Sequence, residues 1–224
     1  IVNVSKNRKL IIDNYIKSKR LQNIKFVETI EIDKNELKRS VKRQKTTQRN
    51  IKLDLLKSSI IDVVQKNKYS KNDLIWNLTI NEGEGLAHYA CLCYVNSDNI
   101  MYYFDPGWNS RNKIGIYNQV YKSFYEPLMV LLNSNSISLM DVSVSGTQMH
   151  PIQKCAPSPG HSLDPFCQTW TLWYSLMFCS CRNPVNITKS LFSLKLKQQY
   201  QIPLNMSVAI IQHNPSLEEH LEYD

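Results

Sequence analysis

The chain has 224 residues, of which 42% are apolar and 21% charged, so it can bury one substantial core and is too apolar for a disordered protein. It has only 6 glycines and neither a GxGxxG nor a GxxxxGK[ST] motif, which excludes nucleotide binding through those glycine-rich loops. No run of 18 uncharged apolar residues occurs, and residues 1–12 contain Lys6, Arg8 and Lys9, so neither a membrane-spanning helix nor a signal peptide is predicted.

The basic charge is concentrated in the first third of the chain. Residues 1–65 carry 16 Lys and Arg against 7 Asp and Glu, a net charge of +9, whereas the remaining residues carry 11 against 12, a net charge of −1. We therefore divide the chain into a basic N-terminal region, 1–65, and a domain, 66–224. Five cations in the first region are candidates for binding nucleic acid or an acidic protein surface: Lys38, Arg39, Lys42, Arg43 and Lys45. The alternative is a solvated helix face, because no aromatic residues are interleaved with these cations.

In chain order, the hydrophobic pattern predicts strands and helices in alternation. Short strands are predicted at 25–32, 73–80 and 137–144, and helices at 34–65, 117–132 and 167–181. Residues 86–95 and 100–104 are continuous, β-favouring apolar runs around the turn Asn96–Asn99, which is typical of a buried hairpin. Pro127 is expected to bend or divide the second helix. One apolar stripe is expected on the last helix: Trp170, Trp173, Tyr174, Met177 and Cys181. The predicted fold class is α+β, with a mixed central sheet packed against helices.

The six cysteines are expected to be mostly core thiols, in a reducing compartment. A CxC pair cannot close on itself easily within a strand or a helix. Zinc ribbons and fingers use spacers of two to four residues, so the pairs Cys91-x-Cys93 and Cys179-x-Cys181 do not predict a metal site.

His88 and Asp105 occupy the two outer ends of the predicted hairpin. Residues equidistant from the turn face each other, and the midpoint of 88 and 105 is close to the turn, so the two side chains are expected at the same edge of the sheet. A carboxylate in that position accepts the imidazole Nδ1–H and stabilises the imidazolium.

Cys167 opens the last predicted helix, where the helix dipole and unpaired N–H groups lower a thiol pKa. A thiolate beside His88 would be an activated nucleophile. Its backbone N–H, together with the side-chain amide of Gln153 or Gln148, could bind an oxyanion. Each residue also has a purely structural explanation: a core histidine, a turn-forming aspartate and a buried thiol.

The order His, Asp, Gln, Cys resembles the adenain-like and SUMO-protease-like cysteine peptidases of the ubiquitin-like-protease clan, and especially the versions encoded by large DNA viruses. The resemblance rests on three segments between about Leu74 and Phe178: Leu86-Ala-His88-Tyr-Ala-Cys-Leu92, Met101-Tyr-Tyr-Phe-Asp105-Pro-Gly107 and Asp164-Pro-Phe-Cys167-Gln-Thr-Trp170-Thr-Leu-Trp173.

The resemblance implies a thiol peptidase that needs no cofactor or metal and works in the host cytoplasm or the virion. Its nucleophile would be Cys167, its general base His88 and its orienting carboxylate Asp105, with Gln153 in the oxyanion hole. The protein substrate would be a viral polyprotein or a conjugate of a ubiquitin-like modifier. The alternative is a catalytically inactive virion or scaffolding protein of the same fold, which binds capsid components or nucleic acid through its basic N-terminal third.

Overall fold

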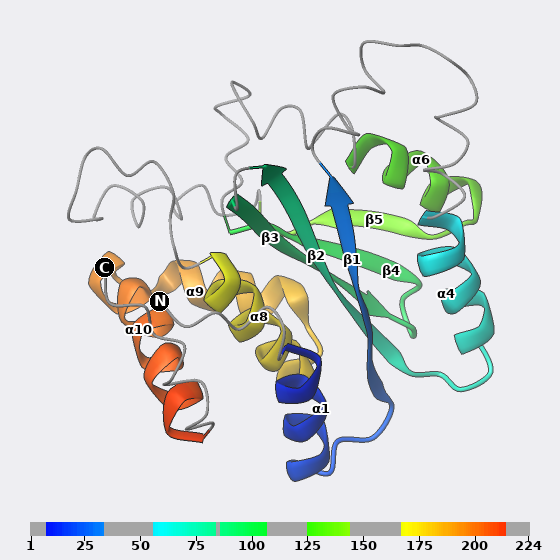
Figure 1. Ribbon diagram of the computed structural model, residues 1–224. Helices are drawn as coiled ribbons and strands as arrows, with labels where there is room; N and C mark the ends of the chain where they lie inside the picture. Colours follow the sequence, from blue (N-terminus) through cyan, green and yellow to red (C-terminus); the bar gives the residue numbers. More distant parts are fainter. Residues whose placement is uncertain (1–7, 34–55, 84–85, 107–124, 144–166, 214–224) are drawn as a thin grey trace.

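A computed structural model describes residues 8–33, 56–83, 86–106, 125–143 and 167–213 (Figure 1). Within them the fold is α+β, as predicted, with one five-stranded mixed sheet between two groups of helices. The strands lie side by side in chain order: β1 (Ile24–Asp33), β2 (Asp73–Gly83), β3 (Leu86–Val95), β4 (Ile100–Phe104) and β5 (Ser138–Asp141). The two outer pairings, β1 with β2 and β4 with β5, are parallel, and the two inner pairings are antiparallel.

The predicted hairpin is confirmed, and β3 and β4 have the bounds expected from the sequence. Both strands are unbroken runs of β-favouring residues, buried on both faces over residues 89–95 and 101–104, and four turn-forming residues separate them. The predicted strands at 25–32 and 73–80 correspond to β1 and β2, and the strand expected at 137–144 is the short β5.

A bulge reverses the faces of β1 partway along the strand. Phe26 pairs with Ile75, whereas Thr29 pairs with Asn77, so β1 has one more residue than β2 between these two pairs. Phe26 and Ile30 therefore pack on opposite faces of the sheet, although residues four positions apart in a regular strand lie on the same face.

Each face of the sheet has its own core. Helices α1 (Arg8–Ser18), α8 (Cys167–Cys181), α9 (Pro184–Ser193) and α10 (Leu196–His213) lie on one side, which we call the α8 face (Figure 1). The π-helix η2 (Lys57–Ile61), α4 (Asp62–Asn67) and α6 (Glu126–Ser134) lie on the other side, the α6 face. Side chains alternate between the two faces, so that in β3 the thiols of Cys91 and Cys93 belong to the α8 face and Leu92 to the α6 face.

Helix α8 is confirmed, but its predicted apolar stripe is only partly correct. Trp170 and Tyr174 are fully buried, whereas Met177 is 37% exposed and Cys181 is exposed. The buried residues run instead from Trp170 through Tyr174 to Phe178, at a spacing of four, because α8 lies on β3 and is also contacted by α1, α9 and α10.

The sequence analysis did not anticipate helices α1, α9 and α10. Asn183 caps α9 by accepting a hydrogen bond from the Asn186 N–H at 3.0 Å, and Pro184 follows in the first turn. An Asn-Pro pair before an apolar segment is a start signal that could have been recognised. In α1, Ile12 packs in the core of the α8 face, and β1 pairs with β2. Residues 8–33 of the basic region therefore share the core of the domain.

The helices predicted at 34–65 and 117–132 are described only in their last parts. Leu56, Ile60 and Val64, from the last part of the first of these helices, are buried on the α6 face. Pro127 lies in the first turn of α6, where its missing N–H costs no hydrogen bond. The part of the predicted helix before Tyr125, which would show a bend or division, lies outside the described residues. None of the helices in the described residues has the length and apolar character needed to cross a lipid bilayer.

Candidate active site

Helix α8 runs lengthwise along the sheet, and three contacts define its direction. The Tyr174 ring stacks on Phe104 with centroids 3.9 Å apart, and Phe104 pairs with Cys91 of β3. One residue later, Ser175 Oγ approaches Asn77 Oδ1, at 3.5 Å. Arg182, directly after α8, reaches Asp73, the first residue of β2, with an N–O distance of 3.9 Å.

These contacts give the position of the first turn of α8. From Tyr174 to Arg182 the helix advances about 12 Å, which matches the roughly 13 Å that β2 covers from Asn77 to Asp73. The helix axis is therefore nearly parallel to the strands. In the other direction, Cys167 begins α8 about 10 Å before Tyr174. On β3 that distance corresponds to about three residues from Cys91, which brings the start of α8 level with His88.

The sheet thus has two ends of different composition. The site end is where β3 begins near His88, β4 ends before Asp105 and α8 begins at Cys167. The anchor end is where β2 begins at Asp73 and Arg182 follows α8. The backbone positions of the three predicted catalytic residues come from three separate elements and lie at the site end.

The hairpin register differs by two residues from the expected one. Val95 pairs with Ile100 and Cys91 with Phe104, so Asp105 continues the register level with Ala90 and not with His88. The reason is that the pairing is centred on the middle of the four-residue turn Asn96–Asn99. This centre lies one residue later in the chain than the midpoint of His88 and Asp105. His88 itself pairs with Ile80 of β2. The separation of about 7 Å along the strand keeps His88 and Asp105 diagonal neighbours at the site end.

Asp105 is a buried carboxylate with an identified hydrogen-bond donor. It is 2% exposed, and its Oδ2 accepts a hydrogen bond from the Tyr103 hydroxyl at 3.0 Å. The Tyr103 ring packs edge-on against Tyr125, with centroids 5.3 Å apart. Burial, followed by the nearby charge of Asp105, raises the pKa of Tyr103 well above its usual range, so the hydroxyl keeps its proton at neutral pH.

The other described cysteines have environments unlike a helix start. Cys91, Cys93 and Cys179 are buried together on the α8 face. Burial raises the pKa of Cys93 well above its usual range and that of Cys179 to about 12, so these thiols are unreactive at neutral pH. Cys181, expected in the core, is exposed.

A buried arginine beside this end was not anticipated. The Arg8 guanidinium lies over the Tyr89 ring, 4.2 Å from its centroid, and Tyr89 follows His88 on β3. Arg8 lies in a run of Lys and Arg, and no sequence signal separates it from its neighbours.

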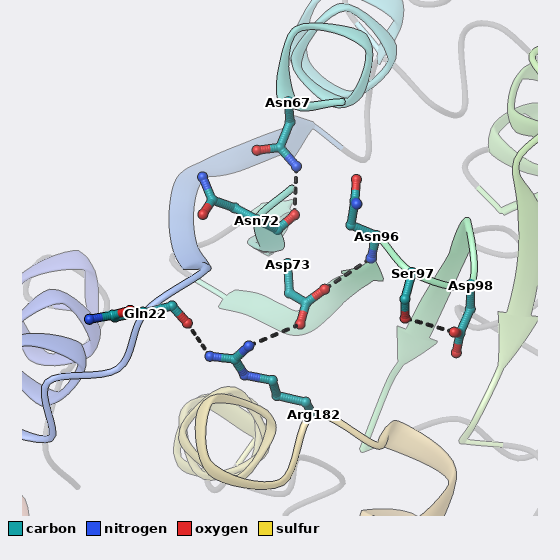
Figure 2. Close-up of polar contacts among 8 residues, drawn as sticks. All are labelled: Gln22, Asn67, Asn72, Asp73, Asn96, Ser97, Asp98 and Arg182. Atoms are coloured by element: carbon teal, nitrogen blue, oxygen red, sulfur yellow. Dashed lines mark hydrogen bonds and ion pairs between the residues drawn. The ribbon is translucent and has the colours of Figure 1, made fainter. Parts of the chain in front are cut away.

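The anchor end is a compact set of polar contacts (Figure 2). Asp73 accepts a hydrogen bond from the Asn96 N–H at 2.9 Å, and Arg182 contacts both Asp73 and the Gln22 carbonyl. Asn67 donates to the Asn72 carbonyl in the adjoining turn. Burial raises the pKa of Asp73, although the Asn96 N–H and Arg182 both oppose that shift.

Several predicted residues lie outside the described ranges: the oxyanion candidates Gln153 and Gln148 and the basic residues Lys38, Arg39, Lys42, Arg43 and Lys45. Within the described ranges, no group of three or more His, Cys, Asp or Glu side chains could hold a metal ion.

No family model matches the chain, and no curated protein matches it either.

Proposed function

We propose that the protein is a cysteine peptidase of the adenain and ubiquitin-like-protease type, which cleaves a peptide or isopeptide bond in a protein substrate of viral or host origin. The observation that carries the proposal is the convergence of three elements at the site end. β3 begins near His88, β4 ends before Asp105, and α8 begins at Cys167 and runs away from that end. The resemblance implies catalytic roles for these same three residues.

In the proposed reaction, His88 removes the proton of the Cys167 thiol, and the thiolate attacks the carbonyl carbon of the scissile bond. The Cys167 N–H, with Gln153, binds the oxyanion. The imidazolium of His88, oriented by Asp105, then protonates the leaving amine. Water, activated by His88, hydrolyses the thioester and restores the free thiol. Every proton is carried by groups of the chain or by water, so no cofactor is needed.

The polar contacts of the two buried aspartates support this assignment. At the anchor end, Asp73 is held by a backbone N–H and an arginine. Asp105 is also buried, and one of its contacts is a hydrogen bond from a tyrosine hydroxyl two residues away along the chain. A helix start level with the neighbouring strand supplies the N–H groups that favour a thiolate.

The experiment is a pH series of iodoacetamide alkylation, with the modification of Cys167 quantified by mass spectrometry. It is done in a Cys155→Ser, Cys181→Ser background, because Cys181 is exposed. We expect an alkylation midpoint for Cys167 below about pH 7, and a midpoint near 8.5 after His88→Ala. The pH midpoint of alkylation reports the pKa of the Cys167 thiol. The absolute alkylation rate does not, because a thiolate becomes less nucleophilic as the pKa of its thiol falls.

The same series tests the alternative, an inactive virion or scaffolding protein of the same fold. A protein without an activated thiolate gives a midpoint near 8.5 both with and without His88. That outcome contradicts the peptidase assignment. The matched control is the unfolded chain in denaturant, in which every thiol should show the ordinary midpoint.

A further inference from the structure

The tyrosine at position 103 is connected to the proposed catalytic carboxylate by a direct hydrogen bond. Its hydroxyl donates to Asp105 Oδ2 at 3.0 Å, and both residues are almost fully buried, with 3% and 2% of their surfaces exposed. A buried carboxylate without hydrogen-bond donors is costly, so this contact restricts the orientation of Asp105.

The tyrosine side chain is itself held in place. Tyr103 belongs to the core of the α6 face, where it packs against the ring of Tyr125. Its hydroxyl therefore approaches Asp105 from the face opposite to α8. The nearby carboxylate Asp141 accepts hydrogen bonds from the backbone N–H, at 2.9 Å, and the hydroxyl of Ser143. The Tyr103 hydroxyl is thus directed to Asp105, although both carboxylates lie near it.

We propose that Tyr103 is a positioning residue of the catalytic site, whose hydroxyl holds Asp105 in the orientation that His88 requires. This inference rests on the proposed function. Tyr103 touches neither substrate nor the reacting atoms; it acts through Asp105, in the way that outer-shell donors orient a catalytic or metal-binding group. Because burial and the charge of Asp105 keep the hydroxyl protonated, it remains a donor over the whole working pH range.

The chain offers a matched control at the other end of the same sheet. Tyr94 is also buried, also belongs to the α6 face, and donates its hydroxyl to Asn99 Oδ1 at 2.9 Å. Tyr94→Phe deletes a partly buried hydrogen bond and Tyr103→Phe a buried one of similar length, and both changes leave the ring. Only the second change touches the proposed catalytic site.

The test is the alkylation midpoint of Cys167 in the full chain, in the Cys155→Ser, Cys181→Ser background. We expect Tyr103→Phe to raise the midpoint by about one pH unit, a loss of roughly tenfold in the thiolate fraction near neutral pH. Tyr94→Phe should leave the alkylation midpoint unchanged. It should lower the melting temperature by an amount similar to the effect of Tyr103→Phe on the melting temperature. In an Asp105→Asn background, Tyr103→Phe should cause no further shift, because its effect passes through Asp105.

Two results overturn the inference while leaving the proposed function intact: an unchanged, low midpoint in Tyr103→Phe, or a shift that persists in the Asp105→Asn background. A midpoint near 8.5 in the parent chain contradicts the proposed function and the inference together. The Asp105→Asn background also guards against misfolding. In this background Tyr103→Phe no longer removes a hydrogen-bond donor from a buried charge.

Discussion

The two ends of the central sheet both carry a buried aspartate, but the contacts of these aspartates differ. At the anchor end, Asp73 joins the start of β2, the β3–β4 turn and the residue after α8 through Asn96 and Arg182. At the site end, Asp105 is held by Tyr103 of its own strand. The first aspartate connects elements that are distant in sequence, which is what a structural carboxylate does. The second is oriented locally, at the end where α8 begins.

This difference shows how one sheet separates stability from chemistry. The stack of Tyr174 on Phe104 and the contact of Arg182 with Asp73 together bring the start of α8 level with His88. The anchor end lies about 20 Å from that start along the helix axis. Changes at the two ends should have separable effects.

The largest expected effect is that of Cys167→Ala, which should reduce peptidase activity by at least about 1,000-fold by removing the nucleophile. The melting temperature should change little, because a thiol at a helix start contributes little packing. Activity on protein substrates and thermal melts of the same preparation measure both. Substantial activity remaining in this variant would contradict the assignment of the nucleophile.

Asp73→Ala should break the anchor end and lower the free energy of unfolding by about 1–3 kcal/mol, because the Asn96 N–H loses its acceptor in a buried position. Denaturant titration measures the loss. The alkylation midpoint of Cys167 should stay low in the molecules that remain folded. Ser97→Ala, in the same turn and bonded only to Asp98 among the contacts of Figure 2, is the matched control and should cost much less.

Cys179→Ala should lower the free energy of unfolding at pH 7 by about 1 kcal/mol, since it leaves a small cavity under α8, while activity per folded molecule is retained. The pKa of Cys179 is raised from 9.0 to about 12 in the folded protein, so above pH 9 the unfolded thiol ionises before the folded one. This group therefore makes the folded state less stable as the pH rises from about 9 to 12.

The variant lacks this alkaline loss, so its difference from the parent chain should shrink between pH 7 and pH 10. Denaturant midpoints at the two pH values provide the comparison. A constant difference would mean that the thiol ionises equally in both states.

Changes in the basic region are expected to have the smallest effect on the two ends of the sheet. Asp33, at the end of β1, pairs with Asn81 near the site end, and the basic cluster follows it along the chain. If the cluster binds phosphates, affinity for duplex DNA should fall with salt at a log–log slope of about −0.9 per contact, and reversing Arg39 and Arg43 to Glu should flatten that slope.

The reversal should leave the Cys167 midpoint unchanged. Substitution in the full chain is the suitable design, because β1 and α1 belong to the core and truncation at residue 65 would remove them. Equal, weak binding by both proteins would identify the cluster as a solvated surface.

The sequence by itself determined the elements whose signals are local. The hairpin has its predicted bounds because two β-favouring runs flank four turn residues, and α8 begins and ends as expected because a proline-rich segment precedes a long apolar run. The roles suggested for His88, Asp105 and Cys167 depended on these boundaries and on the resemblance.

Only the tertiary structure decided what depends on contacts between distant residues. The bulge in β1 follows from its pairing with β2. The direction of α8 follows from its packing on Phe104 and its contacts with Asn77 and Asp73, which no local pattern encodes. Met177 and Cys181 were wrongly expected in the core, and the burial of Arg8 was not predicted, because burial is set by neighbours that come from other parts of the chain.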